Sequence, residues 1–285
     1  MSGVTQLSRV IAVANHKGGT GKTTSTLAIG AALAERGQRV LIVDLDPQGS
    51  LTTAAGTPAA HMAATGGLAP AIQHYLAEGD LRPVPPLLYT VAPGLAILPT
   101  DRRLRGVELT LTGVMGRERV IADHLATLTE TVTAADGRAQ ERDLYDTILL
   151  DCPPGQGLLV INALAAATHV LIPVSPEEMA VDGMRLFLTT LAEAKRARLN
   201  PRLAISGVLV TRVDDTKDAR AQMDEIRATV EPPHIPIVGT IKERTIVKQA
   251  ATAHRSILAY APKSDVADAY RGVAATLIAS WGGAA

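Results

Sequence analysis

The chain has 285 residues, of which 47% are apolar and 20% are charged, and its formal net charge is zero. This length and apolar content allow a full core in one or two domains, while the single cysteine excludes an internal disulfide and suits a reducing cytosol. The neutral balance gives no overall basic field that would attract nucleic acid, and the 2% aromatic content argues against base-stacking platforms for single strands.

Short apolar runs alternate with helical patterns along the chain, which is typical of a parallel sheet with crossover helices. Uninterrupted Val, Ile and Leu predict strands that are buried on both faces. We therefore predict an α/β fold, a doubly wound and mostly parallel sheet flanked by helices, with residues 1–285 as one domain. The Ala- and Thr-rich segment Leu51–Gly67 is expected to be a flexible surface segment. The expected strands are Val10–Ala14, Val40–Val43, Ala96–Leu98, Thr147–Leu150, Val170–Val174, Ile205–Val210 and Pro236–Ile241. The expected helices are Lys22–Arg36, Leu158–Ala167, Val181–Leu199, Lys217–Val230, Thr245–Ala253 and Ser264–Ala279.

The segment from His16 to Thr24 follows the first predicted strand and opens the first predicted helix. Backbone N–H groups of such a loop cradle phosphates at a helix N-terminus, and glycines allow the close approach. Lys22 is expected to reach the β- and γ-phosphates and the Thr23 hydroxyl to ligate Mg²⁺, although the strict pattern has glycine where this chain has His16. The alternative is a glycine-rich turn with two solvated lysines. The candidate nucleotide-binding residues of the loop are Lys17, Gly18, Gly19, Thr20, Gly21, Lys22, Thr23 and Thr24.

Three aspartates lie at the ends of predicted strands. Asp44 and Asp46 follow the second of these strands, and Asp151 follows the fourth. Ligands of open α/β sheets bind beyond the carboxyl ends of the strands, so the phosphate loop and the aspartates are expected to converge on one site. Thr23 and Asp151 are the natural pair for Mg²⁺. The alternative for Asp44 and Asp46 is an ordinary turn, opened by an acidic strand end before a proline.

A second lysine, Lys17, stands ahead of a glycine pair in the loop. This feature resembles the deviant Walker A ATPases, a family that includes ParA/Soj, MinD and the nitrogenase iron protein. Further segments resemble the ParA/Soj partition ATPases in order, from about residue 9 to about residue 280. The resemblance implies a P-loop NTPase fold and a Mg²⁺-dependent ATP hydrolase, with ATP and Mg²⁺ as cofactors. The further segments are Val40–Gly49, Tyr145–Pro154, Asn162–Ala167 with Val170–Val174, and Leu258–Ser264.

The resemblance also implies roles for individual residues. Lys17 matches a lysine that crosses the dimer interface to the partner's nucleotide, as an arginine finger does in trans; the alternative is a solvated loop lysine. Asp46 matches the aspartate that orients the attacking water, and Asp44 supports the metal shell. The implied catalytic residues are Lys17, Lys22 and Asp46, the implied metal-binding residues are Thr23, Asp44 and Asp151, and Thr211 and Lys242 join the nucleotide-binding residues.

A local excess of basic residues is the only charge pattern that points to DNA. Residues 195–255 hold 12 Lys and Arg against 7 Asp and Glu. Two arginines that contact DNA in the resembling family fall here on Thr216 and Ile246, which cannot make those contacts. Lys217, Arg244 and Lys248 lie close enough to substitute; the alternative is that they are exposed charges on helix surfaces.

The function implied by the resemblance is a DNA-partition ATPase of chromosome or plasmid segregation. ATP is expected to make it a homodimer, the dimer to bind double-stranded DNA without sequence preference, and a ParB-like protein to stimulate hydrolysis. The open alternative is a MinD-like or cargo-positioning ATPase that acts on a protein or membrane surface. Membrane attachment needs a C-terminal amphipathic helix with a basic face, and it is disfavoured because no Lys or Arg follows Arg271. A redox role like that of the nitrogenase iron protein is excluded because one cysteine per chain cannot hold an iron–sulfur cluster.

The remaining expectations concern location and the other reactive side chains. No apolar run approaches the ~18 residues of a membrane span, so we expect a cytoplasmic, nucleoid-associated protein without a membrane partner. No helix-turn-helix domain is expected before the first strand. Cys152 is expected to be a small core residue, and the seven histidines show no zinc-binding spacing.

Overall fold

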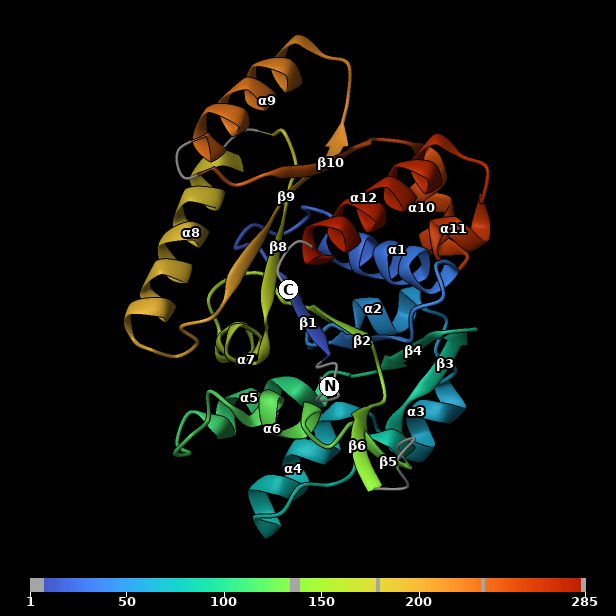
Figure 1. Cartoon of the computed structure of the whole chain (residues 1–285), viewed down its shortest axis with the longest axis vertical. Helices are drawn as coiled ribbons and strands as arrows, with labels where there is room; N and C mark the ends of the chain where they lie inside the picture. The colour runs from blue at the N-terminus through green and yellow to red at the C-terminus, as the bar shows by residue number, and fades with distance from the viewer. Residues whose placement is uncertain (1–7, 134–138, 178–179, 232–233, 283–285) are drawn as a thin grey trace.

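Eight strands of the computed structural model form one sheet, and helices cover both of its faces (Figure 1). The structure describes residues 8–133, 139–177, 180–231 and 234–282. The strands of this sheet are β1 (Arg9–Val13), β2 (Val40–Asp44), β3 (Tyr89–Ala92), β4 (Leu95–Leu98), β7 (Thr147–Asp151), β8 (His169–Val174), β9 (Ala204–Val213) and β10 (Ile237–Lys242); β5 (Thr129–Thr133) and β6 (Ala139–Asp143) form a separate antiparallel pair. The α-helices are α1 (Lys22–Glu35), α2 (Ser50–Ala54), α3 (Ala59–Thr65), α4 (Leu68–Glu78), α5 (Arg103–Leu111), α6 (Val120–Leu125), α7 (Leu158–Ala166), α8 (Ala180–Arg196), α9 (Lys217–Val230), α10 (Thr245–Thr252), α11 (Ile257–Tyr260) and α12 (Asp265–Gly282).

The strand order of the large sheet is β10-β9-β8-β1-β7-β2-β4-β3. All neighbours pair in parallel except β3 and β4, which are antiparallel. The first strand lies inside the sheet, and the chain builds outward from it in both directions, so β1 marks the point where the topology switches. Such a point creates a crevice at the carboxyl ends of the strands. The predicted doubly wound α/β fold is confirmed.

The sheet separates two apolar cores because successive strand residues point to opposite faces. Leu149 of β7 belongs to the core that packs against α1, α2, α10, α11 and α12, whereas the next residue, Leu150, belongs to the core under α4 to α9. Figure 1 shows this arrangement, with α7 and α8 on one side of the central strands and α1 and α12 on the other. Because both faces of the central strands are buried, the residues along them must be largely apolar, which explains the uninterrupted apolar runs in the sequence. Within the described ranges, no helix has the length and apolar character needed to cross a membrane.

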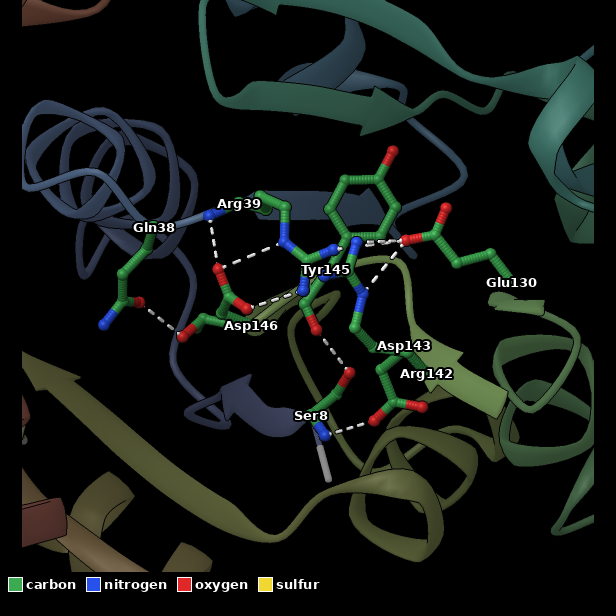
Figure 2. Close-up of polar contacts among 9 residues, drawn as sticks. Ser8, Gln38, Arg39, Glu130, Arg142, Asp143, Tyr145 and Asp146 are labelled. Atoms are coloured by element: carbon green, nitrogen blue, oxygen red, sulfur yellow. Dashed lines mark hydrogen bonds and ion pairs between the residues drawn. The ribbon is translucent and has the colours of Figure 1, made fainter. Parts of the chain in front are cut away.

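A polar network joins the amino ends of the central strands, at the edge opposite the phosphate loop (Figure 2). Arg39, just before β2, donates from its backbone N–H and from Nη2 to the carboxylate of Asp146, just before β7, both at 2.8 Å. Arg39 also pairs with Glu130 of β5 at 3.7 Å, which fastens the small β5–β6 hairpin to the sheet. The network flanks the pairing of β2 with β7, whose register sets Asp44 directly opposite Asp151 at the other end.

The expectation for Leu51–Gly67 is wrong, because this segment forms helices α2 and α3 and returns to the core. Leu51 has no exposed surface. Gly67 has a φ of 66°, and a Cβ atom at this position would lie 2.2 Å from the carbonyl oxygen of Pro99. The Ala and Thr content conceals the order of this segment, which comes from close backbone packing rather than from a strong apolar pattern.

Candidate nucleotide site

The phosphate loop connects β1 to α1 at the topological switch point. Gly19 and Gly21 adopt φ values of 77° and 78°, a left-handed conformation that glycine alone adopts without cost. Thr211, near the end of β9, holds the loop in place, because its hydroxyl donates to the carbonyl oxygen of Thr20 at 2.8 Å. A Cβ atom at Gly21 would meet the side chain of Thr211 at 3.4 Å. Lys22, Thr23 and Thr24 at the start of α1 line the cavity, so the N-terminus of this helix, which is suited to bind an anion, lies at the cavity.

Lys22 is the first residue of α1 and is only 7% exposed. Its ammonium donates to the carbonyl oxygens of Asn15 at 3.2 Å and of Lys17 at 2.9 Å. Burial lowers the pKa of Lys22, while the nearby carboxylates of Asp151 and Asp46 act in the opposite direction. A phosphate group would therefore supply the counter-charge that this buried ammonium needs.

Two fully buried carboxylates lie side by side below the loop. Asp44 and Asp151 pair in register on β2 and β7, and each has no exposed surface. Asp151 accepts from the Thr23 hydroxyl at 2.7 Å. Burial raises the pKa of Asp151 well above its usual range, and the neighbouring Asp44 adds to the shift. Burial likewise raises the pKa of Asp44 to about 7, although hydrogen bonds from Thr52 oppose the shift.

A hard divalent cation fits this donor set. Two carboxylates and a hydroxyl are the oxygen ligands that Mg²⁺ prefers, and a cation beside Thr23 and Asp151 would favour the ionised form that burial disfavours. The hydrogen bonds that Asp44 and Asp151 accept do not offset the effect of burial, so the pKa values of both carboxyl groups stay raised. The residues present therefore fit a magnesium ion.

A cavity of about 470 Å³ opens above the loop and the aspartates. Asp46 lines it after the chain leaves β2, held in a tight turn in which its carboxylate accepts from Gln48 N–H at 2.9 Å. Cys152 also borders the cavity but is 1% exposed and belongs to a core, which agrees with the expectation for this residue. The cavity is lined by Gly18, Gly19, Gly21, Lys22, Thr23, Thr24, Asp46, Ser50, Cys152, Pro154, Arg212, Ile241, Lys242, Glu243, Arg244, Val247 and Lys248.

Lys17 lies at the start of the loop, outside the lining of this cavity. Its ammonium pairs with the carboxylate of Glu177 at 3.5 Å, and its backbone N–H donates to the Asn15 side chain at 3.2 Å. Lys22 already occupies the phosphate side of the loop. Lys17 therefore lies beside the cavity, paired with Glu177, and is not one of its lining residues.

The candidates for DNA contact divide into two groups. Arg244 and Lys248 line the nucleotide cavity, and both are paired, Arg244 with Asp265 at 2.9 Å and Lys248 with Glu243 at 3.6 Å. Lys217 lies elsewhere, at the start of α9. Lys242, predicted as a nucleotide-binding residue, ends β10 at the cavity beside Arg244.

Arg212 also belongs to the site, although no sequence motif indicated it. It follows Thr211 and lines the cavity with a φ of 55°. Its guanidinium donates to the carbonyl of Gly19 at 3.3 Å and pairs with Glu177 at 2.7 Å and with Glu243 at 3.6 Å. Arg212 thus fastens the phosphate loop to the ends of two neighbouring strands. The signal in the sequence was its place directly after the carboxyl end of a predicted strand, where ligands bind.

Comparison with known proteins identifies the family. A family model described as an AAA domain matches residues 8–205. The chromosome-partitioning ATPase Soj of Thermus thermophilus is 35% identical over 273 residues, which are 95% of this chain and 96% of that protein. The chain belongs to the ParA/MinD superfamily of P-loop ATPases.

Other members of the superfamily align over similar lengths. An uncharacterised protein of Mycobacterium tuberculosis is 37% identical over 276 residues, which are 96% of this chain and 80% of that protein. A crystal structure named cobyrinic acid a,c-diamide synthase from Mycobacterium smegmatis, with bound ATP analogue and magnesium, is 32% identical with a TM-score of 0.73, covering 97% of this chain and 96% of that one. The superfamily fold is therefore present over nearly the whole chain.

Proposed function

We propose that this chain is a Mg²⁺-dependent ATPase of DNA partition that dimerises with ATP, binds double-stranded DNA without sequence preference as the dimer, and is released when a ParB-like partner stimulates hydrolysis. The dimer would act in the cytoplasm on the nucleoid. The names of the relatives support this proposal, since they include the chromosome-partitioning protein ParA of Caulobacter vibrioides and Soj of Thermus thermophilus. The observation that carries it is the convergence of Lys22, Thr23 and Asp46 on one cavity, with the buried carboxylate of Asp151 directly behind Thr23.

Within one chain, each residue at the cavity has a distinct task in phosphoryl transfer to water. Lys22 and the loop N–H groups would bind the phosphates, and Thr23 with Asp151 would hold Mg²⁺, which would neutralise phosphate charge. Asp46, partly exposed at the cavity, would orient the attacking water molecule. Asp44, in register with Asp151 on the adjacent strand, would support the metal shell.

The position of Lys17 supports the proposed dimer. A cation held outside its own nucleotide cavity is suited to reach the nucleotide of a second copy, as an arginine finger does in trans. To do so, it must leave Glu177, an exposed pair whose contribution is about 1 kcal/mol or less. Two nucleotides between two subunits can offset that cost.

Sedimentation velocity with a slowly hydrolysed ATP analogue tests the dimer. The wild type and Asp46→Ala should sediment as dimers with the analogue and as monomers with ADP, while Lys17→Ala should bind the analogue and remain monomeric. A Lys17→Ala variant that dimerises fully would refute the trans role. Duplex DNA should be retained on a filter only with ATP, with an affinity that falls steeply as salt increases.

A second candidate is an ATPase that positions a protein cargo rather than DNA. The observation that favours it is the pairing of Arg244 with Asp265 and of Lys248 with Glu243, which reduces the charge available to DNA phosphates. An ATP-dependent dimer that retains no duplex DNA at low salt would support this candidate over partition.

A further inference from the structure

His16 contacts three parts of the molecule at once. It precedes Lys17 in the phosphate loop, where the strict motif has glycine. Its Nδ1 lies 2.9 Å from the carbonyl oxygen of Gly155, in the loop that follows Asp151, and the backbone N–H of Gly155 donates to the His16 carbonyl at 3.0 Å. Its Nε2 lies 3.0 Å from the hydroxyl of Thr190 on α8. The phosphate loop, the loop after β7 and α8 therefore meet on one side chain.

The hydrogen-bond partners assign the tautomer of the His16 ring. A carbonyl oxygen only accepts, so Nδ1 must carry the hydrogen that faces Gly155. In the neutral ring, Nε2 is then an acceptor, and the Gln156 amide, 3.2 Å away, can donate to it. The Thr190 hydroxyl can also donate to Nε2 at 3.0 Å, in competition with the Leu186 carbonyl at 3.3 Å. The edge-to-face contact with the fully buried ring of Phe187, with centroids 5.2 Å apart, fixes the orientation of the imidazole. Both ring nitrogens therefore have hydrogen-bond partners, and the ring also contacts Phe187.

Gly155 shows how the loop after β7 depends on this contact. Its φ is 90°, and a Cβ atom built there would have no other atom within 4 Å, so that side of Gly155 faces open space. The loop begins directly after Asp151, which accepts from Thr23, and ends at α7. A displacement of the phosphate loop on nucleotide binding would therefore move His16 and, through its two hydrogen bonds with Gly155, the loop that follows Asp151.

We propose that His16 is a positioning residue that links the nucleotide state of the phosphate loop to the loop after Asp151 and to α8. The inference rests on the proposed ATPase function and adds to it a route by which the cavity acts on the outer helices. The side chain touches no reacting atom. We call the contact of Nδ1 with Gly155 the loop arm and the contact of Nε2 with Thr190 the helix arm. The loop arm positions the loop after Asp151 for hydrolysis, and the helix arm transmits the displacement to α8.

Four variants separate the two arms. His16→Ala removes both. His16→Asn places an amide where Nδ1 lies and retains the loop arm, while Thr190→Val removes the helix arm alone. Thr189→Val is the matched control, because the Thr189 hydroxyl donates within α8 to Arg185 and lies on an exposed position.

The readouts are ATP affinity, kcat, and hydrogen exchange in α8 with and without a slowly hydrolysed analogue. All variants should bind ATP within about threefold of wild type. His16→Ala should lose about tenfold or more in kcat, the scale expected when a catalytic group is misplaced. His16→Asn and Thr190→Val should retain most of kcat but lose the analogue-dependent change in α8 exchange, and Thr189→Val should behave as wild type.

Two outcomes overturn the inference, and they differ from failure of the proposed function. Normal kcat in His16→Ala refutes the loop arm, and an unchanged α8 response in both His16→Ala and Thr190→Val refutes the helix arm. A thermal melt of each variant separates these results from global destabilisation. A wild type that binds no ATP would instead overturn the ATPase proposal, and this inference with it.

Discussion

Replacing Asp44 by asparagine should change the pH dependence of stability in the absence of Mg²⁺ and nucleotide. The pKa of Asp44 rises from 3.8 to about 7 because the carboxyl group is fully buried. A carboxyl whose pKa is raised by folding stabilises the folded state in its protonated form. That contribution is fully present below pH 3.8 and is lost as the pH rises through about 7.

The magnitude follows from proton linkage. Between pH 6 and pH 8 the unfolded chain is ionised at this position throughout, while the folded chain releases nearly one proton over the interval. The free energy of unfolding of the wild type should therefore fall by roughly 1.4 kcal/mol from this group alone. Asp44→Asn cannot titrate, so this component disappears. The variant also loses one of the two oxygens that accept from Asp46 and Thr52, and it no longer raises the pKa of Asp151.

Urea unfolding at pH 6 and pH 8 in EDTA measures the effect. The difference in unfolding free energy between Asp44→Asn and the wild type should shift by roughly 1.4 kcal/mol in favour of the variant at the higher pH. Asp101→Asn is the matched control, because Arg103 holds the pKa of that exposed carboxyl below its usual range and it does not titrate in this interval. A difference for Asp44→Asn that stays constant with pH would refute the reasoning about the buried pair.

Three further predictions concern the scaffold. Gly67→Ala should destabilise by about 2 kcal/mol or more, measured by urea unfolding, because its Cβ would lie 2.2 Å from Pro99 O at a φ of 66°; an effect under 0.5 kcal/mol would contradict the packing. Asp146→Ala should cost about 1 kcal/mol at pH 7. Burial opposes the ionisation of Asp146, but hydrogen bonds from Arg39 prevail and lower its pKa, so the cost should shrink as the pH falls below about 4, and a cost independent of pH would argue against the pair. Burial raises the pKa of Cys152, so a thiol reagent at pH 8 should modify it only after denaturation; rapid labelling of the native protein would show that Cys152 is accessible.

The sequence was sufficient to predict the parts of the fold and site that depend on local pattern. Uninterrupted apolar strands and the glycine-rich loop identified β1, β2, β7 and the phosphate loop, and placed Thr23 and Asp151 at one edge. The order inside Leu51–Gly67 could not be predicted, because it depends on the backbone of Gly67 meeting Pro99 after folding. The role of Arg212 could not be predicted, because its partners Glu177 and Glu243 follow β8 and β10, and only the strand order of the sheet brings these beside β9.

The raised pKa values of Asp44 and Asp151 could not be predicted from sequence patterns either, and neither could the contacts of His16. Asp44 and Asp151 are far apart in the chain, and only the register of β2 with β7 makes them neighbours. His16 occupies a position in the loop motif, but its partner Thr190 lies in the middle of a helix with no motif of its own.

The central claim, that the cavity above the phosphate loop is a Mg²⁺-dependent ATP site, is tested most directly by calorimetric titration with a slowly hydrolysed ATP analogue. The wild type should bind with Mg²⁺ and much more weakly in EDTA. Lys22→Ala should lose about 100-fold in affinity, since it removes the charged donor to the phosphates, while Lys263→Ala, an exposed lysine outside the cavity, should bind as the wild type does. Equal affinity of the wild type and Lys22→Ala would contradict the account.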